Sequence, residues 1–267
     1  MQSSIQPVID TLVPVVVERG VATITLNSPG NRNALSIRLL EDLHRALDRV
    51  ALDDVRVVVL SHAPPVFCAG ADLRERAAGG SDSGPLVDAL RRIEDLRVPT
   101  IAAITGAVRA GGLGLMAACD LIVIAPTVDF AFAEVRIGVA PAIISVPLLR
   151  RVPWPALAAG FLTGEKFDAT NALRIGLVTH VSQDVAGAVE SLVAGILASA
   201  PGAVAATKHL LRGGARPDRD QAYAEMQQLS DDLFESSEGV EGMQAFLEKR
   251  SPTWAHTEQS VAEAPQG

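Results

Sequence analysis

Cysteine and aromatic residues are scarce in this chain of 267 residues, which has 2 Cys, 2 Trp and 1 Tyr. Cys68 and Cys119 lie far apart and have no histidine near them, which excludes a disulfide framework and the ligand spacing of a zinc site. The histidines are scattered, and neither an H-x-x-x-H pair nor a G-x-S-x-G motif occurs. The sequence therefore predicts no metal site and gives no support to a metal hydrolase or a serine hydrolase.

Long apolar runs and an excess of positive charge are also missing. The 23 Lys+Arg and 31 Asp+Glu give a net charge of −8, which disfavours binding to nucleic acid or to an anionic membrane. Asp120, Asp129 and Glu134 interrupt the most apolar region before it reaches the roughly 20 residues that a membrane span needs. The N-terminus has no basic segment followed by an apolar run, so we expect no secretory signal and a cytoplasmic protein.

Apolar residues make up 48% of the chain and charged residues 20%, so the chain can bury a large core. In the first half, β-branched runs alternate with amphipathic segments. The predicted strands are 13–18, 21–26, 55–60, 100–105, 121–125 and a β-like piece at 130–135, and the predicted helices are 36–50 with Ser36 as its cap, 85–96 and 111–118. Continuous apolar strands that alternate with helices predict an α/β fold with a largely parallel sheet covered on both faces.

The pattern becomes mainly helical beyond Pro141. Predicted helices follow at 145–151, 154–162, 168–174, 185–199, 202–212, 219–236 and 239–249. The last residues are polar and lack periodicity, which indicates a disordered tail. We therefore predict a core domain over 1–200, a C-terminal helical region over 201–250 and a tail over 251–267.

Two glycine-containing loops each follow a predicted strand, at residues 68–72 and 110–112. In an open parallel sheet, ligands bind at the carboxyl ends of the strands. Small side chains at these loops let a ligand approach the backbone, so that N–H groups can be aimed at an oxygen that gains negative charge. The second loop also opens a helix, whose N-terminus favours the same anion. Each loop taken alone is more often simply a turn that needs glycine.

Five segments, in order, resemble the crotonase family, also called the enoyl-CoA hydratase/isomerase superfamily. They are LNSPGNRNALS at 26–36, PPVFCAGADL at 64–73, ITGAVRAGGLGLMAACDLIV at 104–123, AEVRIGVAP at 133–141 and EGMQAFLEKR at 241–250. The similarity covers about residues 10–250. It implies the crotonase fold, a spiral core of ββα type followed by a helical region.

The resemblance also implies a chemistry. Family members polarise the carbonyl of a coenzyme A thioester with two backbone N–H groups, which here match Ala71 and Gly111. Coenzyme A arrives as part of the substrate, and no prosthetic group is implied. Hydratases of the family use two glutamates; Glu134 matches the second, whereas Gly114 stands at the first. We therefore expect a hydratase with a single catalytic glutamate, and a Δ3,Δ2-enoyl-CoA isomerase is the alternative.

Coenzyme A carries about four negative charges, so an acidic protein needs local cations to bind it. The candidate contacts in the matched segments are Arg32, Ala69, Asp72, Leu73, Arg74, Lys249 and Arg250. Asp72 could instead cap a helix or form an ion pair, and for Arg109 we favour pairing with an acidic residue over contact with a substrate carboxylate. The resemblance further implies a homotrimer or a dimer of trimers, with the C-terminal helices at the subunit contact.

Three other interpretations remain open. Residues 112–117 satisfy the dinucleotide pattern G-x-G-x-x-A, although the stretch 106–111 is longer than the turn which that motif needs. Because Gly114 cannot move a proton, the chain could be an acyl-CoA-binding module without catalysis. Glu134 could also be a surface residue that pairs with Arg136.

Overall fold

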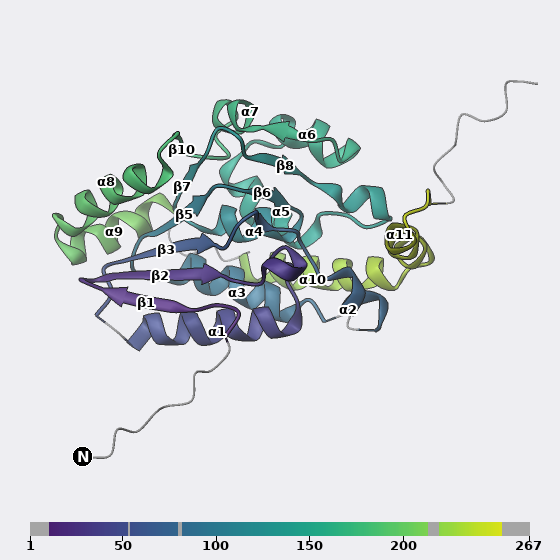
Figure 1. Ribbon diagram of the computed structural model, residues 1–267, viewed down its shortest axis with the longest axis horizontal. Helices are drawn as coiled ribbons and strands as arrows, with labels where there is room; N and C mark the ends of the chain where they lie inside the picture. The colour runs from purple at the N-terminus through teal and green to yellow at the C-terminus, as the bar shows by residue number, and fades with distance from the viewer. Residues whose placement is uncertain (1–10, 53, 80–81, 213–218, 253–267) are drawn as a thin grey trace, which may run out of the picture.

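The computed structural model describes residues 11–52, 54–79, 82–212 and 219–252 (Figure 1). Six strands form the larger sheet in the order β1-β2-β3-β5-β7-β10. These strands are β1 Val15–Glu18, β2 Val21–Leu26, β3 Val57–His62, β5 Thr100–Ile104, β7 Leu121–Ile124 and β10 His180–Val181. All neighbours run parallel except β1 and β2. The predicted α/β class with a largely parallel sheet is confirmed.

A second sheet of four short strands was not predicted. Its order is β4-β6-β8-β9, with bounds β4 Val66–Cys68, β6 Ala107–Arg109, β8 Asp129–Ala131 and β9 Phe167–Asp168. The sequence pattern predicted no strand at β4 or β6, and their omission is wrong. Strands of two or three residues are too short to show an alternating pattern, and they exist because they pair with remote partners.

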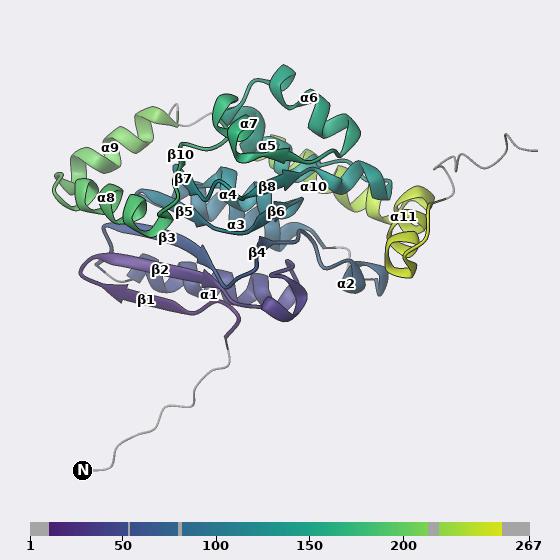
Figure 2. The same ribbon diagram turned by 45° about the horizontal axis from the view of Figure 1, so that its top comes forward.

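Alternate residues of the larger sheet face different helices. Val57 and Val59 pack under α8 (Val185–Leu197). Val58 and Leu60 lie on the other face, in one cluster with buried residues of α1 (Ile37–Leu52) and α3 (Gly84–Asp95). Figure 2 shows the sheet between α1 and α8. Both faces of the central strands are thus covered, as their continuous apolar sequence predicts.

The remaining helices are α4, as predicted, the short α2, which was not predicted, and the helical region expected beyond Pro141, with short strands between some of its helices. They are α2 Leu73–Ala77, α4 Gly111–Ala118, α5 Ala142–Arg151, α6 Trp154–Thr163, α7 Ala169–Arg174, α9 Pro201–Leu211, α10 Arg219–Glu235 and α11 Ser237–Glu248, with 3-10 turns η1 Pro29–Asn31 and η2 Ala133–Ile137. At the start of α1, the Leu39 N–H donates to Ser36 Oγ at 3.2 Å, which confirms the predicted cap. The β-like piece predicted at 130–135 is wrong in its second half, where the chain turns into η2.

Some predictions are not tested by these elements. Most of the predicted tail, residues 253–267, lies outside the described residues, and the division at residue 200 stays a prediction. Within the described ranges, no single helix is long and apolar enough to cross a membrane; α8 and α9 pass that test only as a pair bent by 113°.

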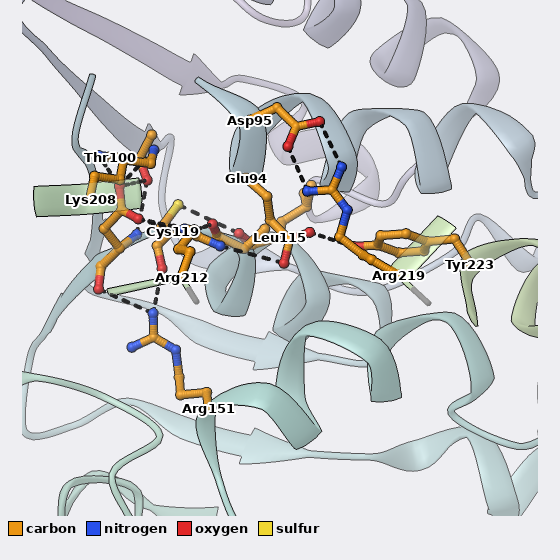
Figure 3. A network of polar contacts seen from close by, with 12 residues as sticks. Glu94, Asp95, Thr100, Leu115, Cys119, Arg151, Lys208, Arg212, Arg219 and Tyr223 are labelled. Carbon is orange, nitrogen blue, oxygen red and sulfur yellow. Dashed lines mark hydrogen bonds and ion pairs between the residues drawn. The ribbon is translucent and has the colours of Figure 1, made fainter. Parts of the chain in front are cut away.

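A buried charged cluster fastens the C-terminal helices to the core (Figure 3). Asp120, at the end of α4, accepts hydrogen bonds from the N–H and Oγ1 of Thr100 at 2.8 and 3.0 Å. Lys208 Nζ lies 2.8 Å and Arg212 Nη2 2.7 Å from its carboxylate. Burial opposes the ionisation of Asp120, but these two cations hold its pKa below the usual value. The cluster therefore ties α9 to the N-terminal ends of β5 and β7.

We expect Asp120→Asn to lower the free energy of unfolding by about 3–5 kcal/mol, because it leaves the buried Lys208 ammonium without its counter-charge. Asp48→Ala is the matched control. It removes a carboxylate that is 65% exposed and pairs with Arg92 at the surface, so its cost should stay below about 1 kcal/mol. Denaturant unfolding measures both values, and equal small losses would show that the buried cluster does not anchor α9.

Candidate active site

The two glycine-containing loops lie against each other because the strands before them pair. β4 and β6 are parallel, with Val66 opposite Ala107 and Cys68 opposite Val108, so the residues that follow them emerge side by side. A Cβ atom on Gly70 would lie 2.7 Å from Cβ of Ala110 and 3.6 Å from the Gly111 nitrogen. Gly70 also has φ +93°, which disfavours any other residue. The loops can touch only because this position is glycine.

The first loop is fastened to residues 32–35. The Ala69 N–H donates to the Arg32 carbonyl at 3.1 Å, and the Leu35 N–H donates to the Gly70 carbonyl at 2.8 Å. Ala71 forms an isolated parallel bridge with Leu35. Among the residues that the structure describes, the Ala71 N–H has no hydrogen-bond acceptor. Since most backbone donors in a folded protein are paired, this N–H is available to a ligand.

The second loop turns sharply into α4. Ala110 has φ +45° and ψ −122°, a strained conformation for a residue with a side chain, and its N–H donates to the Ala131 carbonyl at 3.2 Å. Gly111 is the first residue of α4, and its N–H has no acceptor within the described ranges. All eight residues of α4 are buried. The positive end of this helix therefore lies in a weakly screened environment that favours an anionic oxygen.

Glu134 lies on η2, three residues after the Ala131 carbonyl that holds the second loop. Its Oε2 is buried and has no hydrogen-bond partner among the described residues. Burial raises the pKa of Glu134 to about 7, so its carboxyl can gain and lose a proton near neutral pH. Arg136 does not pair with it, because the guanidinium Nε donates to the Thr163 carbonyl. The geometry supports a carboxyl that exchanges protons rather than a surface ion pair.

The position that matches the first family glutamate is filled by a neighbouring side chain. A Cβ on Gly114 would lie 2.7 Å from Cγ2 of Ile144 on α5. Sequence reasoning missed Ile144, because no local pattern reports which residue of α5 packs on α4. The site therefore has an apolar wall where hydratases with two glutamates have a carboxylate.

The same packing argues against a dinucleotide site at residues 112–117. A Cβ on Gly112 would lie 2.6 Å from Cβ of Cys68, so both glycines of the pattern are used for close packing inside the core. The strand before α4 is moreover β6 of the small sheet rather than β5. Gly112 and Gly114 therefore serve packing inside the core rather than the approach of a pyrophosphate.

The predicted coenzyme A contacts fall into two groups that α11 brings near each other. Arg32, Ala69, Asp72, Leu73 and Arg74 belong to the first loop and its neighbours, and Lys249 and Arg250 follow α11. α11 packs against α2, as Figures 1 and 2 both show. The side chains of Arg32, Arg74 and Lys249 are exposed, and Ala69 and Leu73 are half-buried. Contact of these residues with coenzyme A stays a prediction.

Two of these side chains already have protein partners. Asp72 caps α2, since its Oδ1 accepts from the Arg74 N–H at 3.0 Å. Arg250 forms a bidentate pair with Glu241 at 2.7 Å and also binds Glu248. The cap at Asp72 is the role that the sequence analysis weighed against ligand contact.

Arg109 and the cysteines have structural roles. Arg109 Nη2 lies 2.7 Å from Asp129 Oδ2, which confirms the expected pairing with an acidic residue. Cys68 and Cys119 are free and buried, and burial raises the pKa of both thiols to about 12. Neither thiol is a nucleophile at neutral pH. No group of His, Cys, Asp or Glu in the described part of the chain could hold a metal ion.

Touching loops with unpaired N–H groups, a buried and unpaired carboxyl on the turn that follows β8 and a parallel α/β core define a protein of the crotonase fold. The sequence profile described as enoyl-CoA hydratase/isomerase matches residues 17–257, and the chain belongs to this family. The fold that the resemblance implied is confirmed.

Relatives differ in the reactions they carry out. The mitochondrial enoyl-CoA hydratase domain-containing protein 3 of Danio rerio is 33% identical over 251 residues, which cover 91% of this chain and 87% of that protein. A crystal structure of an enoyl-CoA hydratase from Mycobacterium avium is 45% identical, covers 92% of this chain and 100% of its own, and superposes with a TM-score of 0.83. Methylmalonyl-CoA decarboxylase in complex with 2-nitronate-propionyl-CoA is 28% identical, with coverages of 92% and 99% and a TM-score of 0.80.

The contact between Gly114 and Ile144 predicts a coupling that unfolding measurements can detect. Gly114→Ala should cost roughly 1–3 kcal/mol, because the new methyl would overlap Ile144. Ile144→Ala should cost about 2–5 kcal/mol by leaving a cavity. The double variant should cost clearly less than the sum, since each change relieves the other.

Gly195→Ala on α8 is the control for this cycle. Nothing lies within 4 Å of the added Cβ, so this change should stabilise by up to about 1 kcal/mol through helix propensity. Strict additivity of the Gly114 and Ile144 changes would mean that the two residues do not touch.

Glu134→Gln should stabilise the protein in a pH-dependent way. The folded pKa of Glu134 is about 7 and the unfolded value is 4.5, so the folded protein holds a proton that the unfolded chain releases between these pH values. The wild type should therefore lose stability from pH 4.5 to 7 relative to Glu134→Gln, by roughly 3 kcal/mol at pH 8 and by almost nothing at pH 4. Glu190→Gln, at an exposed carboxylate of α8, should show no such trend. Denaturant unfolding across this range checks the difference.

Proposed function

We propose that this protein is an enoyl-CoA hydratase that adds water across the 2,3 double bond of an enoyl-CoA thioester. The observation that carries the proposal is the pair of unbonded N–H groups of Ala71 and Gly111 on two touching loops. One such donor typically contributes about 3–4 kcal/mol to the stabilisation of a transition state. The coenzyme A complex of a related decarboxylase supports a thioester as the ligand.

In the proposed mechanism, the thioester oxygen accepts hydrogen bonds from both N–H groups, which lowers the energy of the enolate. Glu134 takes a proton from water as the water oxygen bonds to Cβ, and the electron pair of the double bond moves into the enolate. The carbonyl re-forms when Cα takes a proton, either from the Glu134 carboxyl or from solvent. A pKa near 7 lets the same group act as base and then as acid.

One observation favours isomerisation as a second candidate. Ile144 fills the place at Gly114 where a second carboxylate would stand, so this position offers no carboxylate to work with Glu134. A shift of a 3-enoyl to a 2-enoyl thioester needs only one base, which removes a proton from C2 and returns it to C4. Both reactions use the same paired N–H groups.

We further propose a homotrimer or a dimer of trimers located in the cytoplasm. Support for an assembly comes from apolar side chains that no described residue covers. Leu210 and Leu211 at the end of α9 are 76% and 83% exposed, and Trp154 at the start of α6 is 71% exposed. Exposed apolar side chains at helix ends favour contact with another protein surface.

Glu134→Gln should lower turnover about 10²- to 10⁴-fold and leave acyl-CoA binding intact, because the amide keeps the shape but cannot accept the proton. Turnover is followed by ultraviolet absorbance of the conjugated bond with a panel of 2-enoyl and 3-enoyl thioesters. Loss of absorbance from a 2-enoyl thioester indicates hydration, and a gain from a 3-enoyl thioester indicates isomerisation.

Binding is measured as thermal stabilisation by a saturated acyl-CoA, with Glu190→Gln as the control for turnover and folding. Unchanged turnover in Glu134→Gln would rule out the mechanism. Thermal stabilisation without turnover of any thioester would identify a binding module instead.

A further inference from the structure

The backbone of α11 touches the turn that carries Glu134. A Cβ atom on Gly242 would lie 2.1 Å from the Ile137 carbonyl oxygen and 2.3 Å from its carbon. From the other side, a Cβ on Gly138 would lie 2.5 Å from the Glu238 carbonyl oxygen. Each contact joins backbone to backbone, so no side-chain rotation could relieve the overlap. α11 can approach η2 this closely only because both positions are glycine.

The contact reaches Glu134 through the hydrogen bonds of its own turn. The N–H groups of Gly138 and Val139 both donate to the Glu134 carbonyl. Ile137 and Gly138, which α11 touches, are therefore bonded parts of the turn that presents the carboxyl. A shift of α11 against this turn would move Glu134 as well.

We propose that Gly242 is a positioning residue: its missing side chain lets α11 press η2 inward, so that the Glu134 carboxyl lies buried beside the two loops. The inference rests on the proposed role of Glu134 in proton transfer. It assigns to the C-terminal segment EGMQAFLEKR a function within the same chain, in addition to any contact with coenzyme A or another subunit.

Burial, and not charge, is the property that this contact would control. The charged residues on the elements packed against η2 are Glu238, Glu241 and Glu248 of α11, Arg136 belongs to η2 itself, and α6 has none. None of these groups contributes to the raised pKa of Glu134, whose cause is desolvation, opposed only by a hydrogen bond from its own backbone. The depth of η2 therefore sets the proton affinity of the carboxyl.

The test is Gly242→Ala, examined first by a measurement that needs no turnover. The stability gained by Glu134→Gln at pH 8 is determined in the parent and in the Gly242→Ala background. Because the added methyl would force α11 and η2 apart, loosen the turn and admit water to Glu134, we expect this gain to fall to less than half of its parent value. An unchanged gain would overturn the proposal even if turnover were lost.

The second measurement is the pH dependence of kcat. With Glu134 more solvated, the acid limb should shift to lower pH by about one unit, and kcat should fall about tenfold with little change in KM. A loss of stability alone would not move the acid limb. If Glu134 has no catalytic role, Gly242→Ala will leave kcat unchanged but will still reduce the stability gained by Glu134→Gln. The positioning role of Gly242 and the catalytic role of Glu134 can therefore fail separately.

Gly187→Ala on α8 is the control that lies away from η2. Its Cβ would lie 2.3 Å from Asp184 Oδ2, at the N-cap of α8. It should destabilise the fold but leave the Glu134→Gln gain and the acid limb in place. Equal shifts in both variants would overturn a specific role for Gly242.

If Gly242→Ala does not fold, Met243→Ala takes its place. Met243 is 3% exposed, so its truncation loosens the packing of α11 without driving atoms into η2. A smaller reduction of the Glu134→Gln gain is expected, and no reduction would again contradict the proposal.

Discussion

The site depends on the parallel pairing of two three-residue strands, β4 and β6. This pairing makes the chain emerge at two neighbouring points, and the small residues that follow let the loops touch. The packing at this junction is so close that a Cβ atom on Gly70, Gly111 or Gly112 would overlap a neighbouring residue. Ala110 has a strained conformation at the same place, which shows a backbone held by tertiary contacts rather than by local preference. Two N–H groups are left unpaired as a result.

Two buried carboxyl groups of this protein have pKa values shifted in opposite directions. Asp120 loses solvent but gains Lys208 and Arg212, which stabilise its charge and lower its pKa. Glu134 loses solvent and gains no cation, so its pKa rises to about 7. The paired carboxylate fastens helices to the sheet, whereas the unpaired one can exchange protons. Burial by itself does not distinguish a structural carboxylate from one that can exchange protons; the charges beside it do.

The C-terminal helices belong to the architecture of the site. α9 is held to the N-terminal ends of the inner strands β5 and β7 through Asp120, and α10 is linked to the core by the hydrogen bond from Tyr223 to Glu94. α11 then extends from α10 to the back of η2 and to α2, which follows the first loop. α11, which lies far along the chain, thus supports both the turn that carries Glu134 and the helix that follows the Ala71 N–H. Contacts of this kind make a site sensitive to changes that never touch its ligand.

Local patterns in the sequence determined the parallel α/β class, the cap of α1 at Ser36 and most helices after Pro141, because spacing along one element reports which of its faces is buried. The motifs led to Ala71, Gly111 and Glu134 through their resemblance to a family. Only the tertiary structure decided that β4 and β6 are strands, that Ile144 closes the space at Gly114 and that Gly242 meets Ile137. These features are distances between remote backbone segments, which follow from the packing of the whole core and leave no periodic trace in either segment.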